Sequence, residues 1–158
     1  MHSTIFPALV AGAFAWQISA PAGAQTLAVA HSGGSETYEI SAVISTFKHY
    51  EIVTHSTWTG RHSPRYRGVR LSDVLAHHDL TGEAIEVGAE NGYVSKIPFH
   101  MIEKYQPILA FEANGAALDY FSRGPLSLIW PRSDYPTELG ETTDGMWTWY
   151  VNSIALDH

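Results

Sequence analysis

After residue 24 the chain consists mainly of short segments in which apolar and polar residues alternate or apolar residues run together. Alternation over about four to eight residues is typical of a half-buried β-strand, and a short apolar run between turn residues is typical of a buried one. We therefore predict strands within 28–41 with a turn at Gly33-Gly34, at 49–53, around 85–87, at 93–97 after Asn91-Gly92, at 108–118 with a turn at Asn114-Gly115, at 126–130 and at 146–156.

Three segments have a helical pattern instead. Leu71–His78 is the clearest, because its apolar residues fall at i, i+3 and i+4 and Gly82 follows its end. Ser41–Phe47 and Phe99–Tyr105 are shorter, and we interpret Tyr66–Leu75 as a turn that leads into the clearest helix. The pattern as a whole predicts an α+β fold, a mixed and mainly antiparallel β core with short flanking helices.

The first 24 residues have a different composition. Ile5–Ala20 is mostly apolar and small, and Ala22-Gly23-Ala24 fits the small-x-small pattern of a signal peptidase site. The apolar run is too short to span a bilayer comfortably. We interpret residues 1–24 as a secretory signal peptide and residues 25–158 as a single domain. A retained signal anchor is the alternative, against which the helix breakers Pro21 and Gly23 argue.

Composition excludes several classes of partner. The net charge is −7, only 16% of residues are charged, and no Lys/Arg cluster is longer than a dipeptide. Nucleic acid and anionic membrane surfaces are therefore not expected partners. The chain contains no Cys, which excludes both disulfides and a thiolate ligand for a metal.

The loop Thr54–Gly60 follows the strand at 49–53 and is rich in hydroxyl and ring-nitrogen groups. Such a loop suits a planar, polar ligand, because the ligand ring would stack on Trp58 while the hydroxyls of Ser56 and Thr57 meet its edge. The alternative is a solvated loop whose Trp packs inward.

A second polar loop, Trp130–Pro136, follows the apolar strand at 126–130. Arg132 offers a planar fork of N–H donors, Ser133 a hydroxyl, and Asp134 a carboxylate that can accept from a ring –NH₂ group. The alternative is an ion pair between Arg132 and Asp134 at the surface, which would contribute little to stability.

Two further positions are weaker candidates for the same site. Asn91 and Tyr93 offer an amide and a phenol at the start of a strand, although Asn91-Gly92 is also an ordinary hairpin turn. Glu112 is a second candidate, after Asp134, for the carboxylate that binds the ligand. The alternative is that Glu112 is an exposed residue at the edge of the sheet.

The histidines do not predict a metal site or a hydrolase. His55 and His62 flank the first loop, and none of the histidines has a metal-ligand spacing. His77 and His78 are interpreted as surface residues favoured by a helix C-terminus. Ser56 lies near His55, but no Gly-x-Ser-x-Gly elbow is present, so hydrolase chemistry is not expected.

Three segments, Tyr66–Leu75, Ile108–Leu118 and Arg123–Pro131, together resemble the sulfite-oxidase-type molybdopterin-binding domain. In that family an aromatic-x-Gly-x-x-Leu-x-x-Leu-Leu helix follows the cofactor loop. A Leu-Ala-Tyr/Phe strand then enters an Asn-Gly hairpin, and a Gly-Pro-Leu/Val strand enters the second cofactor loop. The resemblance covers about Tyr38–Leu156 and implies a pterin pocket between the loops after strands 49–53 and 126–130.

One difference from the family changes the expected function. The family's enzymes hold molybdenum through a Cys in the loop that here begins near Thr54, and this chain has no Cys. The chain is most similar to small exported relatives without Cys, which resemble periplasmic pterin-responsive regulators. The resemblance therefore implies a periplasmic protein that binds a pterin without molybdenum or redox catalysis. Its partner would be the periplasmic domain of a membrane-bound cyclic-di-GMP enzyme or sensor kinase.

Two other functions stay open from the sequence. One is a molybdopterin-dependent oxidoreductase or its accessory subunit, holding the metal without a protein thiolate. The other is a structural accessory protein without a small-molecule ligand.

Overall fold

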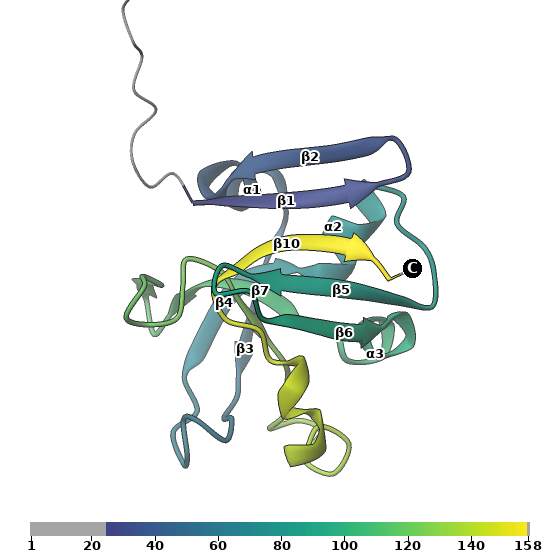
Figure 1. Ribbon diagram of the computed structural model, residues 1–158. Coiled ribbons are helices and arrows are strands. Elements are labelled where there is room, and N and C mark those ends of the chain that lie inside the picture. The colour runs from purple at the N-terminus through teal and green to yellow at the C-terminus, as the bar shows by residue number, and fades with distance from the viewer. Residues whose placement is uncertain (1–24, 158) are drawn as a thin grey trace, which may run out of the picture.

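Two β-sheets form the framework of residues 25–157, the part of the chain that the computed structural model describes (Figure 1). The first sheet has the order β2-β1-β10-β5-β6. Strands β1 and β10 are parallel, and every other neighbouring pair in this sheet is antiparallel. Its strands are β1 (Thr26–His31), β2 (Gly34–Glu39), β5 (Ala84–Ala89), β6 (Val94–Pro98) and β10 (Val151–Leu156).

The second sheet is antiparallel throughout and has the order β3-β4-β7-β8, with β9 also paired to β7. Its strands are β3 (His49–Val53), β4 (Arg65–Arg70), β7 (Ile108–Ala113), β8 (Ala116–Ala117) and β9 (Ser127–Ile129). Gly68 of β4 lies close against the backbone of β7, because a Cβ at this position would lie 2.2 Å from the Leu109 carbonyl oxygen. Only glycine fits that contact.

Short helices flank the sheets: α1 (Ile40–Thr46), α2 (Leu71–His77), α3 (Phe99–Tyr105) and the 3₁₀ helix η1 (Glu141–Met146). Buried apolar side chains of both sheets and of the three α-helices form one core, with Val43, Leu71, Ile102, Leu109 and Ile154 almost inaccessible to solvent. The predicted mixed, mainly antiparallel β core with short flanking helices is therefore confirmed.

Two predicted element boundaries are wrong. Residues 65–70 form strand β4, not a turn, although α2 begins at Leu71 as predicted. This strand lies between β3 and β7, and both Gly68 and Val69 are buried, so the expected alternation is hidden. The last strand begins at Val151 instead of residue 146, because Tyr150 has a positive φ of 56° that interrupts the extended backbone.

The predicted signal peptide, residues 1–24, lies outside the described residues. Within residues 25–157, none of the helices has the length and apolar character needed to cross a bilayer.

Candidate functional site

The loops that follow β3 and β9 meet, as the sequence predicts. The backbone N–H of Ser133 donates to Thr54 Oγ1 at 3.1 Å, and the backbone N–H of His55 donates to Ser133 Oγ, also at 3.1 Å. A ring nitrogen of His55 lies 2.8 Å from the same hydroxyl. Ser133 therefore joins the two loops, and its hydroxyl is already used in that contact.

Arg132, Thr57 and Asp144 form a second connection between these loops and η1. Arg132 Nη1 donates to Asp144 Oδ1 at 3.0 Å and to Thr57 Oγ1 at 2.9 Å, and Thr57 Oγ1 donates to Asp144 Oδ2 at 2.6 Å. The side chains of Arg132 and Asp144 are only 12% and 21% exposed. Arg132 thus pairs with Asp144, not with Asp134, and it holds three chain segments together.

Two adjoining pockets share Trp147 and Trp149 in their linings. The larger, about 330 Å³, is also lined by Trp58, Asn91, Tyr93, Asp144 and Gly145. The smaller, about 220 Å³, is also lined by Ser56, Tyr66, Phe121, Ser122, Arg123, Ser127 and Ile129. Four of the residues predicted from the sequence, Ser56, Trp58, Asn91 and Tyr93, therefore lie in these linings. The loop after β3 and the segment of η1 extend from the same end of the sheets (Figure 1).

Aromatic rings form the walls of this region. Trp58 meets Trp149 edge to face, with ring centroids 4.6 Å apart, and lies 6.2 Å from Trp147. The guanidinium carbon of Arg123 lies 4.0 Å from the centre of the Trp149 ring, within cation–π range. Trp58 is 41% exposed, so part of its ring is accessible to a flat ligand while the rest packs on the neighbouring tryptophans.

Trp147 has a polar atom without a partner. The residue is 5% exposed, and its Nε1–H donates to no protein acceptor within the described residues. A buried donor left unpaired costs free energy, so it needs an explanation. Trp147 lines both pockets, so this unpaired donor belongs to a residue of the candidate site.

The rim and floor carry neutral polar groups. Asn91 Oδ1 accepts the backbone N–H of Tyr93 at 3.1 Å, and the Tyr93 hydroxyl donates to the Gly145 carbonyl at 2.5 Å. Burial raises the pKa of Tyr66, which lines the smaller pocket, so its phenol is neutral at physiological pH. The Asn91 amide nitrogen is the group at this rim best suited to a ligand.

Asp134 and Glu112 lie outside both linings. Asp134 is exposed, and its predicted contact to a ligand stays a prediction. Glu112 lies on β7 and faces Arg67, with 4.0 Å between Nη1 and Oε2. Asp144 is the carboxylate that lines the larger pocket, and sequence reasoning missed it.

Sequence reasoning also missed Trp147, Trp149 and Arg123. The signal available was the dense aromatic run Met146–Tyr150, which was interpreted only as a strand. Arg123 has a positive φ of 72° and lies in the loop before β9, where no local pattern marks it as a pocket residue.

A cavity larger than either tryptophan pocket lies elsewhere. It measures about 850 Å³ and is lined mainly by residues of α2, α3 and the segment between α2 and β5. None of the residues predicted for the ligand site lines it. We place the candidate site at the tryptophan pockets, because the unpaired donor and the aromatic walls are there.

One prediction about the histidines is wrong. His77 is exposed as expected, but the side chain of His78 is only 3% exposed. The end of α2 packs against the β1–β2 hairpin, so the His78 ring contacts His31 and Tyr38. The residues in contact are at least forty positions apart in the chain, so no local sequence pattern could have predicted the burial of His78.

Residues 26–133 match the sequence model of the family described as oxidoreductase molybdopterin binding domain. The chain belongs to this family. No match was found among curated protein sequences.

A solved structure supports the same fold for this molybdopterin-binding domain. The crystal structure of the sulfane dehydrogenase SoxCD from Paracoccus pantotrophus aligns with a TM-score of 0.59 at 15% identity. The alignment covers 83% of this chain but 37% of that one. The present chain therefore spans little more than a third of that chain's length.

The donor atoms present do not fit a molybdenum ion. Thr54 occupies the start of the first loop and is fully buried. Its hydroxyl donates to the His55 carbonyl at 3.3 Å and accepts a hydrogen bond from the Ser133 N–H. The protein itself therefore uses this hydroxyl both as a donor and as an acceptor. The chain has no thiolate to replace it. The aromatic walls of the pockets, in contrast, need no metal to receive a flat ring.

Proposed function

We propose that this chain is a periplasmic pterin-binding protein that senses a pterin and relays its occupancy to a membrane-bound signalling partner, without redox catalysis. The partner class expected is a cyclic-di-GMP enzyme or a sensor kinase. The observation that carries the proposal is the tryptophan-walled pair of pockets, with its unpaired buried donor, in a molybdopterin-binding domain that has no Cys.

The chemistry of a pterin supports its choice as ligand. A pterin has a flat bicyclic ring with a polar edge of alternating donors and acceptors. Trp58 and Trp149 offer aromatic surface for the ring, and base–aromatic stacking contributes about 1–3 kcal/mol. Trp147 Nε1–H and the Asn91 amide are donors for the acceptor atoms of the edge.

A surface beside the pockets supports the relay. Tyr120 and Phe121 are 65% and 93% exposed, and Phe121 also lines the smaller pocket. A ligand there would contact a side chain that a partner protein can contact from outside. The pterin would then favour one arrangement of this loop, and a partner that binds this arrangement better would respond to occupancy.

The second candidate function is a molybdopterin-dependent oxidoreductase or its accessory subunit. It is favoured by the family's description and by the similarity of fold to a sulfane dehydrogenase. The metal distinguishes the two functions, because an oxidoreductase of this family needs molybdenum.

For protein purified from the periplasm, we expect no stoichiometric molybdenum and no oxidation of sulfite, because the chain lacks a thiolate ligand. Elemental analysis and a sulfite oxidation assay on the same preparation are the measurements. About one molybdenum per chain would reject the proposed function and favour the oxidoreductase.

Trp58→Ala is expected to weaken binding of a reduced pterin by about tenfold or more, because stacking is lost and each 1.4 kcal/mol corresponds to about tenfold. Trp58 is partly exposed, so folding should be retained. Anaerobic titration calorimetry with tetrahydrobiopterin measures the change.

Two variants sharpen this titration. Trp147→Phe keeps a ring but removes the unpaired donor, and should weaken binding by a few-fold, since a hydrogen bond contributes about 0.5–1.5 kcal/mol. Asp134→Asn is the control, because its side chain lies outside both pockets. Wild-type affinity in both tryptophan variants would place the pterin elsewhere, and weaker binding in Asp134→Asn would restore the assignment made from sequence.

A further inference from the structure

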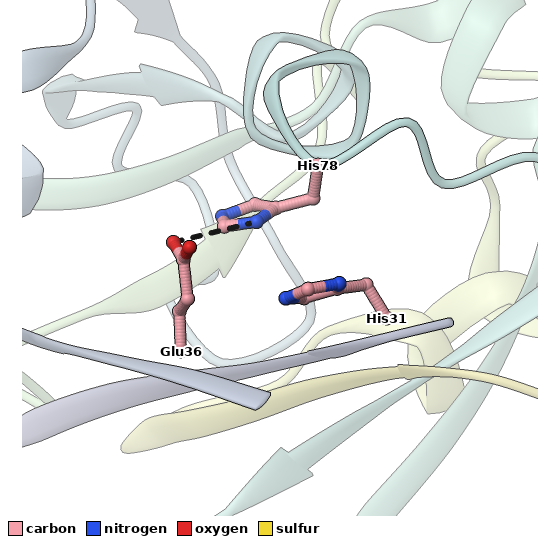
Figure 2. Close-up of side chains that lie close together, drawn as sticks. All are labelled: His31, Glu36 and His78. Atoms are coloured by element: carbon pink, nitrogen blue, oxygen red, sulfur yellow. Dashed lines mark ion pairs between the residues drawn. The ribbon is translucent and has the colours of Figure 1, made fainter. Parts of the chain in front are cut away.

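Three potential metal ligands converge at the C-terminal end of α2, and none of them lines the tryptophan pockets. His31 ends β1, Glu36 lies on β2, and His78 follows the last residue of α2. One donor atom from each of the three lies within 4.8 Å of the other two. Figure 2 shows the rings of His31 and His78 one above the other, with the Glu36 carboxylate beside them. The rings are stacked at 5.6 Å and 25°.

Tyr38 fixes which nitrogen of His78 carries a proton. The Tyr38 hydroxyl donates to Glu36 Oε2 at 2.5 Å, so its oxygen is free to accept from His78 Nε2, 3.1 Å away. A proton on Nε2 leaves Nδ1 of the neutral ring as an acceptor. This Nδ1 faces Glu36 Oε2 at 3.8 Å. Two acceptors thus face each other, an arrangement that a cation between them would stabilise.

The charge states suit a metal. Burial lowers the pKa of His78, whose side chain is 3% exposed, and the nearby His77 and His31 lower it further, against the opposing effect of Glu36. The hydrogen bond from Tyr38 lowers the pKa of Glu36. Burial and the carboxylate raise the pKa of Tyr38 to about 12. These shifts only accompany the geometry, in which one donor atom from each of the three residues lies within 4.8 Å of the others.

His31 completes the set. Its Nδ1 accepts the backbone N–H of Gly33 at 3.2 Å, which leaves Nε2 as the nitrogen for a metal. One ring nitrogen of His31 points toward Glu36 (Figure 2). Metal binding at Nε2 moves the ring proton to Nδ1, so the Gly33 hydrogen bond is lost when the site fills.

We propose that His31, Glu36 and His78 bind a divalent transition-metal cation of the zinc class, at a site separate from the pterin pockets. Two imidazoles and one carboxylate are a ligand set that Zn²⁺ uses, at about 2.0–2.2 Å from each donor, with a fourth position left for water. Tyr38 acts as the outer hydrogen-bond partner that orients a ligand histidine. The side chain of Glu36 is 55% exposed, which gives the ion a path from solvent.

The bound ion would fasten the β1–β2 hairpin to the end of α2. The hairpin lies at one edge of the first sheet, where β2 pairs only with β1. An ion that binds the folded chain and not the unfolded one raises the midpoint of thermal unfolding. The site rests on none of the residues used for the proposed function, so the two proposals can fail independently.

The test is titration calorimetry of the untagged, chelator-treated chain with ZnCl₂, together with thermal unfolding with and without the metal. We expect one Zn²⁺ per chain and a higher midpoint. Loss of an outer hydrogen-bond partner alone costs about 10–100-fold in metal affinity, so Tyr38→Phe should weaken binding by at least about tenfold. Glu36→Gln and His78→Gln should weaken it by more and abolish the rise in midpoint.

His100→Gln is the matched control, because it removes one exposed histidine of α3 far along the chain from the cluster. It should bind Zn²⁺ as the wild type does. Glu36→Gln keeps the test valid if His78→Gln fails to fold, because Glu36 is exposed. The proposal is overturned if the wild type shows no saturable binding, or if Glu36→Gln leaves affinity unchanged. Equal losses in Glu36→Gln and His100→Gln would also overturn it.

Discussion

Trp130→Ala is expected to lower the free energy of unfolding by about 3–5 kcal/mol, the usual range for truncation of a buried Trp. Trp130 is 1% exposed and is among the largest fully buried side chains. Its Nε1–H also donates to the Met146 carbonyl at 2.9 Å. The substitution would therefore leave a cavity and remove the hydrogen bond to the Met146 carbonyl, and each is destabilising.

Urea denaturation followed by circular dichroism measures this change. Trp130→Phe fills most of the volume but lacks the N–H donor, so it should lower the free energy of unfolding clearly less than Trp130→Ala does. Trp58→Ala is the matched control, because that ring is 41% exposed and should cost far less stability. A Trp130→Ala variant as stable as Trp58→Ala would contradict the assignment of Trp130 to the core.

The same hydrogen bond connects stability to the candidate site. Met146 directly precedes Trp147, and the segment from Trp147 to Tyr150 is not a regular strand, although Thr148 bridges to Leu128. Trp130 therefore helps to fix the position of the tryptophans that line both pockets. We infer that the pockets are largely formed before a ligand binds, which lowers the entropic cost of binding.

Much of the fold could be predicted from local pattern. The strand at 49–53 and the helix at 99–105 have the predicted bounds, since an alternating run and a helix entered through Pro98 carry their signals within a few residues. Strand β4 was missed because it lies between β3 and β7 in the sheet, and burial of Gly68 and Val69 there removes the alternation.

The sequence predicted only the part of the site formed by the two loops after the strands at 49–53 and 126–130. Ser56 and Trp58 were found because they follow a recognisable strand, and the family resemblance indicated that the second loop lies beside them. Asp144 and Trp147 could not be found this way, because their roles depend on contacts with residues far away in the chain. Thr57 and Asp144, for example, are 87 positions apart.

The His31–Glu36–His78 cluster shows the same limit. A metal site is recognised in sequence when its ligands share one helix or one turn. Here the third ligand is 42 positions after the second, and the packing of α2 on the hairpin brings them together. Only the tertiary fold makes this spacing meaningful.

Arg132→Met is expected to lower the free energy of unfolding by about 2–3 kcal/mol, somewhat below the 3–5 kcal/mol typical of a fully buried pair. The lower figure reflects the partial exposure of Arg132 and Asp144, 12% and 21%. Removal of the guanidinium leaves the Asp144 carboxylate, deep beside the pocket, with Thr57 as its remaining side-chain donor. The loop after β9 would then lose its ion pair with η1 and keep the Trp130–Met146 hydrogen bond, so pterin affinity should fall as well.

A double-mutant cycle with Asp144→Asn decides whether this effect comes from the pair. If it does, Arg132→Met combined with Asp144→Asn costs no more than Arg132→Met alone, because no uncompensated charge remains. The exposed pair Arg65–Glu51 is the matched control: it has a similar distance of 3.1 Å but side chains that are 61% and 52% exposed. Arg65→Met should therefore cost less than about 1 kcal/mol. Additive losses at Arg132 and Asp144 would show that each residue acts separately, and the two cofactor loops would then depend on Ser133 and Thr54 for their junction.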